Sequence, residues 1–522
     1  YTLHTLFPYT TLFRSQDHDG SHIKGLLINF LQVAFPSLLK LPNFFQEFIT
    51  PIVKVWKGPN PKTATSRTFF TMPQYDEWRE RHKLERSWKH KYYKGLGTST
   101  TQDAQVYFTK LDEHLKEFEP IKREEEDLFD LAFSKKRADH RKQWLGNFIP
   151  GTFLDHSSSK ISYDDFVNRE LILFSMADNM RSIPSVIDGL KPGQRKVIYS
   201  AFTRNITSDM KVVELAGYCS GLTAYQHGEQ SLQGTIIGLA QDFVGSNNVN
   251  CLEPSGNFGS RLAGGSDAAS PRYIYTRLSP FARRVFSPLD EANLEYNTDD
   301  DRRIEPKVYC PIVPMVLING AEGIGTGWST SIPNYHPEDI VTNLKRRMGR
   351  LDSSEEQPFE TMTPWFRGWK GVVEEAGPDR FRADGRITEG PGDNEVEITE
   401  LPIRVWTDDF KGKLEEVIKG EKVTSFIKDY KEFNDHDNVH FVVQMDPSQM
   451  KVALTEGLEE KFKLQKTIAT SNLVAFDLQG RIRKYSKVEE ILEEFYVHRL
   501  AMYTKRKEDR KSTTSELQSP VL

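Results

Sequence analysis

Residues 271–276 read Pro271-Arg272-Tyr273-Ile274-Tyr275-Thr276, a strand-like stretch with tyrosines at alternate positions. Two helical patterns precede it, at 194–204 and 230–243, and the second carries an apolar stripe of Leu232, Ile236, Leu239 and Phe243. Helices followed by short strands with glycine and proline turns indicate a helix-turn-helix with a wing. The sequence therefore predicts a winged-helix domain over 161–290.

Tyr273 and Arg272 are the first candidates for chemistry. A phenol attacks phosphorus poorly unless a base removes its proton, and the pentacoordinate transition state needs cations on its oxygens. Arg272 can supply one such cation, and the preceding Gly264-Gly265-Ser266-Asp267 is typical of a flexible run. Alternatively, Tyr273 and Tyr275 are same-face residues of a half-buried strand, which the short motif alone does not exclude.

The composition predicts a soluble, intracellular protein of several domains. The chain has 522 residues, of which 38% are hydrophobic, and its length suggests about three or four domains. No run approaches the ~18 apolar residues of a membrane span, and no signal-peptide pattern opens the chain. The three cysteines are odd in number and far apart, which suggests neither a disulfide framework nor a cysteine zinc site.

The net charge of -5 argues against a nucleic-acid partner, but the charge is unevenly distributed. Acidic runs lie apart from the basic clusters. A single basic cluster is usually a solvated face, whereas five in one chain favour a basic track for phosphate. These clusters occupy 79–94, 134–142, 191–196, 345–350 and 505–511.

The expected fold class is multidomain, with α/β and α+β parts. Residues 1–15 show no helix or strand period and nearly repeat themselves, so we expect them to be artefactual. Strands and helices alternate over 16–117, where Ser21 is the expected N-cap of an amphipathic helix. The charged stretch 118–160 indicates a connector.

In the second half, strand-like and helical pieces alternate from about residue 360 to 480. Its apolar run at 311–318 is a candidate buried strand. A helix with apolar residues at helical spacing follows from Val488 to Tyr503, and 512–522 form a polar tail.

Asp17 and Asp19 are the metal candidates. Two hard carboxylates two residues apart on a turn can hold Mg²⁺ through oxygen. The alternative is an aspartate-rich entry to a helix, and so short a motif does not decide between them.

Several other motifs suit phosphate or nucleic acid. Lys191, Arg195 and Lys196 lie at a helix start, where backbone N–H groups also attract anions. Lys94 lies in a turn with two glycines. This turn can bind a phosphate backbone, or it can simply be a solvated turn. His227, before the next helix, can contact a phosphate or assist proton transfer, although a lone histidine is more often structural.

Gly323-Ile324-Gly325-Thr326-Gly327 lacks the spacing of a nucleotide-binding loop. An apolar Ile324 held out on this glycine-rich loop can instead act as a wedge between base pairs.

Seven motifs in order resemble the DNA breakage-reunion region of eukaryotic type IIA DNA topoisomerases, the topoisomerase II family. They are QDHDGSHIKGLLINF, KYYKGLGTST, IPSVIDGLKPGQRKV, YQHGEQSL, DFVGSNNVN, PRYIYT and NGAEGIGTGW. The resemblance runs from Gln16 to about Arg510. It implies a partial TOPRIM (Rossmann-like) domain over 16–117, a linker over 118–160, the winged-helix domain, a tower domain over 291–480 and the start of a coiled-coil gate over 481–511.

The resemblance also implies roles for particular residues. Tyr273 would attack a DNA phosphodiester and become linked to the 5′ phosphate, Arg272 would stabilise the transition state, and His227 and Arg195 would assist. Ile324 would insert into the DNA, and Asp17 and Asp19 would hold Mg²⁺. The implied DNA contacts include Lys135, Lys136, Lys191 and Ser231.

At the level of the whole protein, the resemblance implies a nuclear homodimer that cuts double-stranded DNA and passes a second duplex through the break using ATP. The chain departs from the family in several ways. Ser15 replaces the first aspartate of the D-x-D-x-D run, and Gln226 replaces a histidine. We also expect the chain to lack the E-G-D-S-A motif, the ATPase domain and a complete coiled coil.

We therefore expect a truncated or mis-assembled copy, with a catalytically silent DNA-binding fragment as the alternative function. A TOPRIM nuclease or primase is disfavoured by the sequence after residue 160.

Overall fold

The computed structural model describes residues 17–59, 65–82, 85, 87–93, 100–225, 227–299, 302–351, 355–421 and 424–518, with side chains to residue 511. The segment 1–15, Lys94 and Gln226 lie outside these residues. The chain divides into two compact units. The first unit is Tyr1–Met180 with Gly325–Trp328, and the second is Arg181–Ile324 with Ser329–Leu522. Among the described residues, no helix is both long enough and apolar enough to cross a membrane.

The first unit contains two three-stranded sheets. One has the order β1 (Gln46–Phe48), β5 (Leu115–Phe118), β6 (Lys160–Ile161), and the other has β3 (Thr65–Phe69), β2 (Val53–Lys57), β4 (Trp88–Tyr92). Helix α3 (Met72–Arg81) packs Tyr75 and Trp78 against the second sheet. The remaining elements are α2 (His18–Ala34), η2 (Leu38–Lys40), α4 (Thr101–Thr109), α5 (Leu111–His114), α6 (Arg123–Phe133), η4 (Lys135–Arg137), α7 (Ala138–Gly146), α8 (Tyr163–Asp165), the π-helix η5 (Phe166–Leu171) and α9 (Ile172–Ser182).

Helix α2 begins earlier than the sequence predicts. Asp17, not Ser21, is its N-cap, because the Asp17 carboxylate accepts the Gly20 N–H at 2.9 Å. Ser21 is buried inside the first turns of the helix. The prediction of Ser21 as the N-cap was wrong. Asp and Ser cap helices about equally well, so residue type alone does not distinguish them, and in the packed structure the earlier residue is the cap.

The charged stretch expected as a connector contains α6 and α7. Phe129 and Leu145 on these helices are buried, and Phe129 belongs to the same core as Ile28 of α2 and Ile161 of β6. The many charged residues of these helices lie on their outer faces. The composition of the stretch therefore does not reveal its apolar stripe.

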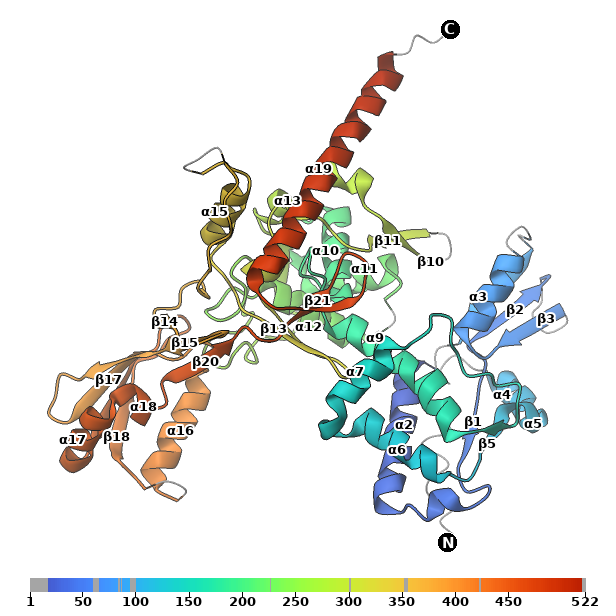
Figure 1. Cartoon of the computed structure of the whole chain (residues 1–522), viewed down its shortest axis with the longest axis horizontal. Coiled ribbons are helices and arrows are strands. Elements are labelled where there is room, and N and C mark those ends of the chain that lie inside the picture. The colour runs from blue at the N-terminus through green and yellow to red at the C-terminus, as the bar shows by residue number, and fades with distance from the viewer. Residues whose placement is uncertain are drawn as a thin grey trace. The chain divides into compact units, whose positions relative to one another are not determined.

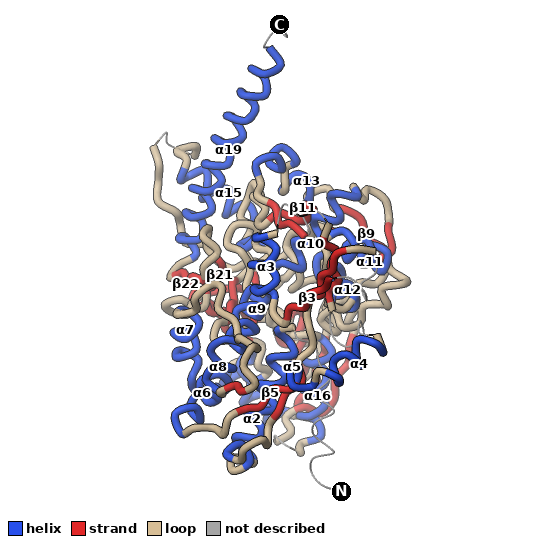
Figure 2. The backbone as a smooth tube through the Cα atoms, turned by 90° about the vertical axis from the view of Figure 1, so that its right-hand side faces the viewer, coloured by secondary structure: helices blue, strands red, loops and turns tan. Residues whose placement is uncertain are grey.

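The second unit places three helices beside a small antiparallel sheet. The helices are α10 (Pro192–Arg204), α11 (Val212–Leu222) and α12 (Glu229–Ala240), and the sheet has the order β7 (Met210–Lys211), β9 (Tyr275–Leu278), β8 (Leu252–Ser255). Figures 1 and 2 show α10, α11 and α12 close together. The structure confirms the two predicted helices, and the second ends three residues before Phe243.

The prediction of a strand over 311–318 was wrong. Met315–Ile318 form the short helix α14, and all four residues are buried. A short, continuous apolar run carries no periodicity, so it cannot distinguish a buried strand from a buried helix.

The rest of the second unit alternates strands and helices, as predicted. A four-stranded sheet has the order β16 (Arg386–Glu389), β17 (Glu395–Glu400), β19 (Phe441–Met445), β18 (Ile427–Glu432), and a three-stranded sheet has β14 (Val372–Glu375), β15 (Arg380–Asp384), β20 (Gln465–Ala469). Three hairpins pair β10 (Tyr296–Asp299) with β11 (Arg302–Pro306), β12 (Ala321–Ile324) with β13 (Ser329–Ile332), and β21 (Leu473–Phe476) with β22 (Ile482–Tyr485). The other helices are α13 (Ala282–Val285), η6 (Pro288–Asn293), α15 (Pro337–Arg347), α16 (Thr407–Lys419), α17 (Pro447–Glu456) and α18 (Leu458–Lys461).

The last helix, α19 (Val488–Gln518), is longer than its apolar pattern. Ile491, Leu492 and Phe495 bury its first turns, and the buried Arg499 donates to Asp290 at 2.7 Å. Beyond these turns the helix projects away from the core of its unit (Figure 1).

Candidate functional site

Tyr273 lies in a turn directly before β9, with 72% of its side-chain surface exposed. Its backbone N–H donates to the Ser270 carbonyl at 2.9 Å. Ile274 and Thr276, on either side of Tyr275, are almost fully buried. The alternation of the strand therefore directs Ile274 and Thr276 inward and both tyrosines outward.

The backbone around Tyr273 is fixed from two sides. The Ile274 carbonyl accepts the Val212 N–H at 3.1 Å, and the Pro271 carbonyl accepts the Val213 N–H at 3.3 Å. β9 then pairs with β7 on one side and β8 on the other. The Tyr273 side chain is thus solvent-exposed on a backbone that its neighbours hold in place, and Arg272 beside it is also exposed.

The glycine-rich loop before Tyr273 is ordered by specific contacts, which corrects the expected flexible run. Gly264 has φ +62°, and a Cβ there would lie 2.3 Å from the Trp406 ring. Asp267 accepts the Ser260 N–H at 2.9 Å and the Ser260 hydroxyl at 2.7 Å. The glycine is required by close packing and a left-handed backbone, not by mobility.

At the start of α10, the Arg195 guanidinium is buried. Its Nε and Nη2 donate to the two carboxylate oxygens of Asp188, at 2.7 and 3.0 Å, and Nη2 also donates to the Leu190 carbonyl. Burial by itself would lower the pKa of Arg195, but the Asp188 charge holds it above the ordinary value. Among the described residues, no acceptor is hydrogen-bonded to Nη1 of Arg195. Nη1 is therefore the nitrogen of this guanidinium that is left to bind an external anion.

Asp188 is a residue that the sequence analysis missed. It is fully buried and also accepts the backbone N–H groups of Leu190 and Tyr309. Asp188 precedes Arg195 by seven residues and lies in an I-D-G-L-K-P turn. No periodic pattern in the sequence indicates that these two side chains form an ion pair.

The two lysines at this helix start differ. Lys191 donates to the Glu322 carbonyl at 2.7 Å, and burial lowers the pKa of its ammonium. Lys196 faces inward and binds the Thr223 carbonyl at 2.7 Å and the Glu305 carboxylate at 2.9 Å. The ammonium of Lys196 is therefore committed to contacts inside the protein.

His227 and Ser231 lie together at the start of α12, and both are exposed. The Tyr225 hydroxyl donates to the Ser231 hydroxyl at 3.3 Å, and the Tyr225 and His227 rings are 5.5 Å apart in an edge contact. Tyr225, which the sequence analysis did not select, links the two predicted residues. The same apolar core contains Val197 of α10, Ile236 of α12 and Ile274, so one scaffold carries Arg195, Ser231 and Tyr273.

Ile324 ends β12 with 85% of its side chain exposed. The two glycines beside it are required sterically. A Cβ at Gly323 would lie 2.0 Å from the Ser182 carbonyl oxygen, and one at Gly325 would lie 2.2 Å from the Asn179 amide oxygen. The close approach of the backbone on both sides leaves the isoleucine projecting from the hairpin.

The first unit carries the remaining predicted residues. Asp17 caps α2 and Asp19 lies in its first turn. Lys135 and Lys136 are exposed on η4, where the neighbouring Arg137 pairs with Asp127 at 2.7 Å.

Fold and site geometry together define a mixed α/β protein that presents an exposed tyrosine beside Arg272. A family model that describes the A-type subunit of DNA gyrase/topoisomerase IV matches residues 181–519. A second, described as the C-terminal associated domain of TOPRIM, matches residues 48–179. Since the first covers well over half of the chain, the chain belongs to this DNA gyrase/topoisomerase IV family.

Named relatives agree with the resemblance seen in the sequence. The chain is 67% identical over 493 residues to DNA topoisomerase 2 of Penicillium chrysogenum, a match that covers 94% of this chain and 31% of the relative. It is 51% identical to DNA topoisomerase 2 of Saccharomyces cerevisiae, covering 96% and 34%. The chain thus spans about a third of the length of the curated relatives it matches.

A solved structure is also similar. It is described as the DNA-binding, cleavage and re-ligation domain of Plasmodium falciparum topoisomerase II. The match has a TM-score of 0.79 and 46% identity, and it covers 96% of this chain and 66% of the other. The expected resemblance to eukaryotic topoisomerase II is confirmed.

Proposed function

We propose that this chain is the DNA breakage-and-reunion part of a eukaryotic type II DNA topoisomerase. The observation that carries the proposal is the exposed Tyr273 on its fixed backbone beside Arg272. Within this proposal, 16–117 form a partial TOPRIM domain, 118–160 a linker, 161–290 a winged-helix domain and 291–480 a tower domain, and 481–511 start a coiled-coil gate.

In the proposed reaction, the Tyr273 hydroxyl loses its proton and its oxygen attacks a DNA phosphorus. The bond from phosphorus to the 3′ oxygen breaks, and that oxygen takes up a proton to become a free 3′ hydroxyl. One phosphoester is exchanged for another, so the 3′ hydroxyl can reverse the step without a further energy source.

Two arginines are proposed to stabilise the transition state of this exchange. Arg272 is adjacent in sequence, and the Asp188 pair fixes the guanidinium plane of Arg195, which lowers the cost of ordering it around a phosphate. His227 is the proposed proton carrier. The proposed DNA contacts include Lys191, Ser231, Lys135 and Lys136, with Ile324 as the wedge.

Lys94 and Lys196 belong to the same proposed DNA surface, but their support differs. Lys94 lies outside the described residues. For Lys196, a phosphate would have to compete with Glu305 and the Thr223 carbonyl, so its direct contribution should be small.

Asp17 and Asp19 fit Mg²⁺ in donor type, because both offer carboxylate oxygens at the start of α2. When bound there, Mg²⁺ would supply positive charge to the phosphate oxygens. Asp17 also caps the helix, so its side chain is already oriented by the Gly20 N–H.

At the scale of the whole protein, we propose a nuclear homodimer that passes one DNA duplex through another using ATP. The similarity to DNA topoisomerase 2 of two fungi supports this, as does the match to the Plasmodium domain.

The test is covalent capture of supercoiled plasmid in Mg²⁺, stopped with detergent and separated after protein digestion. The chain should form an adduct that Tyr273→Phe abolishes and Tyr275→Phe retains, since Tyr275 is the neighbouring tyrosine on the same face. An adduct that survives in Tyr273→Phe would refute the assignment. Salt-sensitive duplex binding without any adduct, over a range of Mg²⁺ concentrations, would instead establish the catalytically silent DNA-binding alternative.

A further inference from the structure

The first unit contains a buried cluster of charged residues that the DNA-cleavage proposal does not use. Glu47 comes from β1, His156 from the loop before β6, and Glu170 from η5, and all three surround Lys24 of α2. None of the four side chains exposes more than 14% of its surface.

Lys24 uses only one oxygen of each carboxylate. Its ammonium binds Oε2 of Glu47 and, at 2.7 Å, Oε1 of Glu170. Glu47 Oε1 and His156 Nδ1 are buried and have no hydrogen-bond partner among the described residues. Glu170 Oε2 is also buried and makes no hydrogen bond of ordinary geometry there, although the nearby Ser21 hydroxyl interacts with this carboxylate. Buried polar atoms are almost always satisfied in folded proteins, so such atoms gathered in one cluster point to a missing ligand.

The spacing of the cluster suits a single ion. One ligand atom from each of Glu47, His156 and Glu170 lies within 4.8 Å of the other two. His156 Nε2 is 3.7 Å from Glu47 Oε1. Tetrahedral Zn²⁺ with bonds of about 2.0–2.1 Å keeps its ligand atoms roughly 3.3 Å apart. The ligand atoms of the cluster, which lie within 4.8 Å of one another, would therefore have to approach by up to about 1.5 Å when an ion binds.

The charges leave room for a cation. Glu47 and Glu170 bring two buried carboxylates together. Lys24 contacts both, and the buried Lys116 ammonium also interacts with Glu47. The carboxylate oxygens that Lys24 does not bind remain as candidate ligands.

We propose that Glu47, His156 and Glu170 bind one divalent transition-metal ion of the zinc type, with Lys24 orienting both carboxylates from behind. One imidazole and two carboxylates are a zinc-type donor set, and hydrogen-bonded carboxylates are typical outer partners of metal ligands. The ion would link β1, the loop before β6 and η5, which are far apart in the chain. This proposal is independent of Tyr273 and of Asp17 and Asp19.

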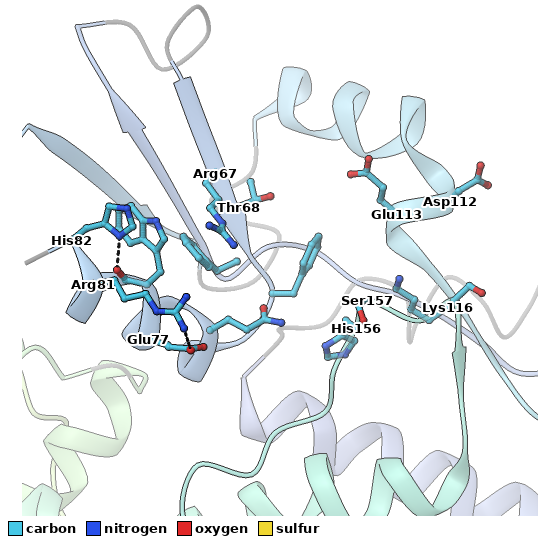
Figure 3. Close-up of a pocket in the computed structure, with 15 residues that line it drawn as sticks. Arg67, Thr68, Glu77, Arg81, His82, Asp112, Glu113, Lys116, His156 and Ser157 are labelled. Carbon is cyan, nitrogen blue, oxygen red and sulfur yellow. Dashed lines mark hydrogen bonds and ion pairs between the residues drawn. The ribbon is translucent and has the colours of Figure 1, made fainter.

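His156, but neither Glu47 nor Glu170, lines a cavity of about 570 Å³ together with Lys116, Ser157 and Ser159. Figure 3 shows His156 and Ser157 on the side of this cavity toward Lys116, away from Arg81 and His82.

The test is titration of Zn²⁺ into the chelator-treated chain, without DNA or Mg²⁺, by calorimetry and by competition with a chromophoric chelator. We expect one Zn²⁺ per chain and at least a tenfold loss of affinity in His156→Ala. This variant is preferred because it leaves both partners of Lys24 in place. His82→Ala is the matched control, since His82 lines the same cavity outside the cluster, and it should bind Zn²⁺ as the parent does.

Two further measurements keep the proposal falsifiable. The double variant Asp17→Asn with Asp19→Asn should retain the Zn²⁺ site, which excludes binding at the start of α2. X-ray absorption of the Zn²⁺-loaded parent should show one imidazole nitrogen among light oxygen ligands. No Zn²⁺ binding by the parent, equal binding by His156→Ala, or a spectrum without imidazole would each overturn the proposal, whatever the outcome of the adduct assay.

Discussion

Tyr273 and Arg195 are carried by the same core, yet the fold treats them in opposite ways. Tyr273 has a fixed backbone and a side chain that is 72% exposed, whereas Arg195 is buried and paired with a fully buried carboxylate. Tyr273 is thus a group presented to an external partner, whereas Arg195 also stabilises its own unit. Substitutions should therefore affect stability at one residue and chemistry at the other.

The largest loss of stability should come from Arg195→Met. Removing the guanidinium leaves Asp188 charged and buried, so we expect the free energy of unfolding to fall by about 3–5 kcal/mol. The measurement is the urea transition of the second unit. Lys191→Met, at the same helix start, removes one bond to a carbonyl and should cost only about 1 kcal/mol. Equal losses would show that Arg195 is no more structural than Lys191.

Gly264→Ala should come next. The new Cβ would meet the Trp406 ring at a residue with positive φ, so we expect a loss of roughly 1–3 kcal/mol. Gly234→Ala is the matched control in the interior of α12, where a Cβ meets nothing within 4 Å. It should stabilise the protein by up to about 1 kcal/mol. A neutral Gly264→Ala in thermal unfolding would show that the loop is indeed flexible.

Asp267 should produce a smaller, pH-dependent effect beneath the Tyr273 turn. Partial burial opposes its ionisation, but the Ser260 N–H and hydroxyl hold the pKa of Asp267 below its ordinary value. Its contribution is therefore present above about pH 4 and is lost as the pH falls through the lower native pKa. In Asp267→Asn, stability should fall less steeply between about pH 4 and pH 2, and Ser260→Ala should show part of the same change. An unchanged slope in both variants would contradict this assignment.

Tyr273→Phe and Ile324→Ser should have the smallest effects on stability. Both side chains are mostly exposed, so each change should alter the free energy of unfolding by less than about 0.5 kcal/mol. Ile324→Ser should reduce the bending of bound DNA measured by energy transfer between end labels, while Tyr273→Phe should not. A large loss of stability in Tyr273→Phe would place that tyrosine with Arg195 as a structural residue.

Local patterns in the sequence correctly predicted the long helices. The structure confirms helices at α10, α12 and α19, because their apolar residues recur at helical spacing. The same reasoning failed at 311–318, where no period exists, and at Ser21, where two capping residues compete. It also took the glycines at 264 and 265 for a flexible run, because the Trp406 ring that demands Gly264 lies more than a hundred residues away.

The sequence by itself determined the family, through seven ordered motifs, and it placed Tyr273 beside Arg272. Tertiary structure decided which cations face outward, since Arg195 and Lys196 are paired inside the protein while Lys135 and Lys136 are exposed. It also assembled Glu47, His156 and Glu170, which no sequence spacing connects. The physical reason is that burial and charge pairing depend on residues distant in the chain, whereas motifs and periods record only near neighbours.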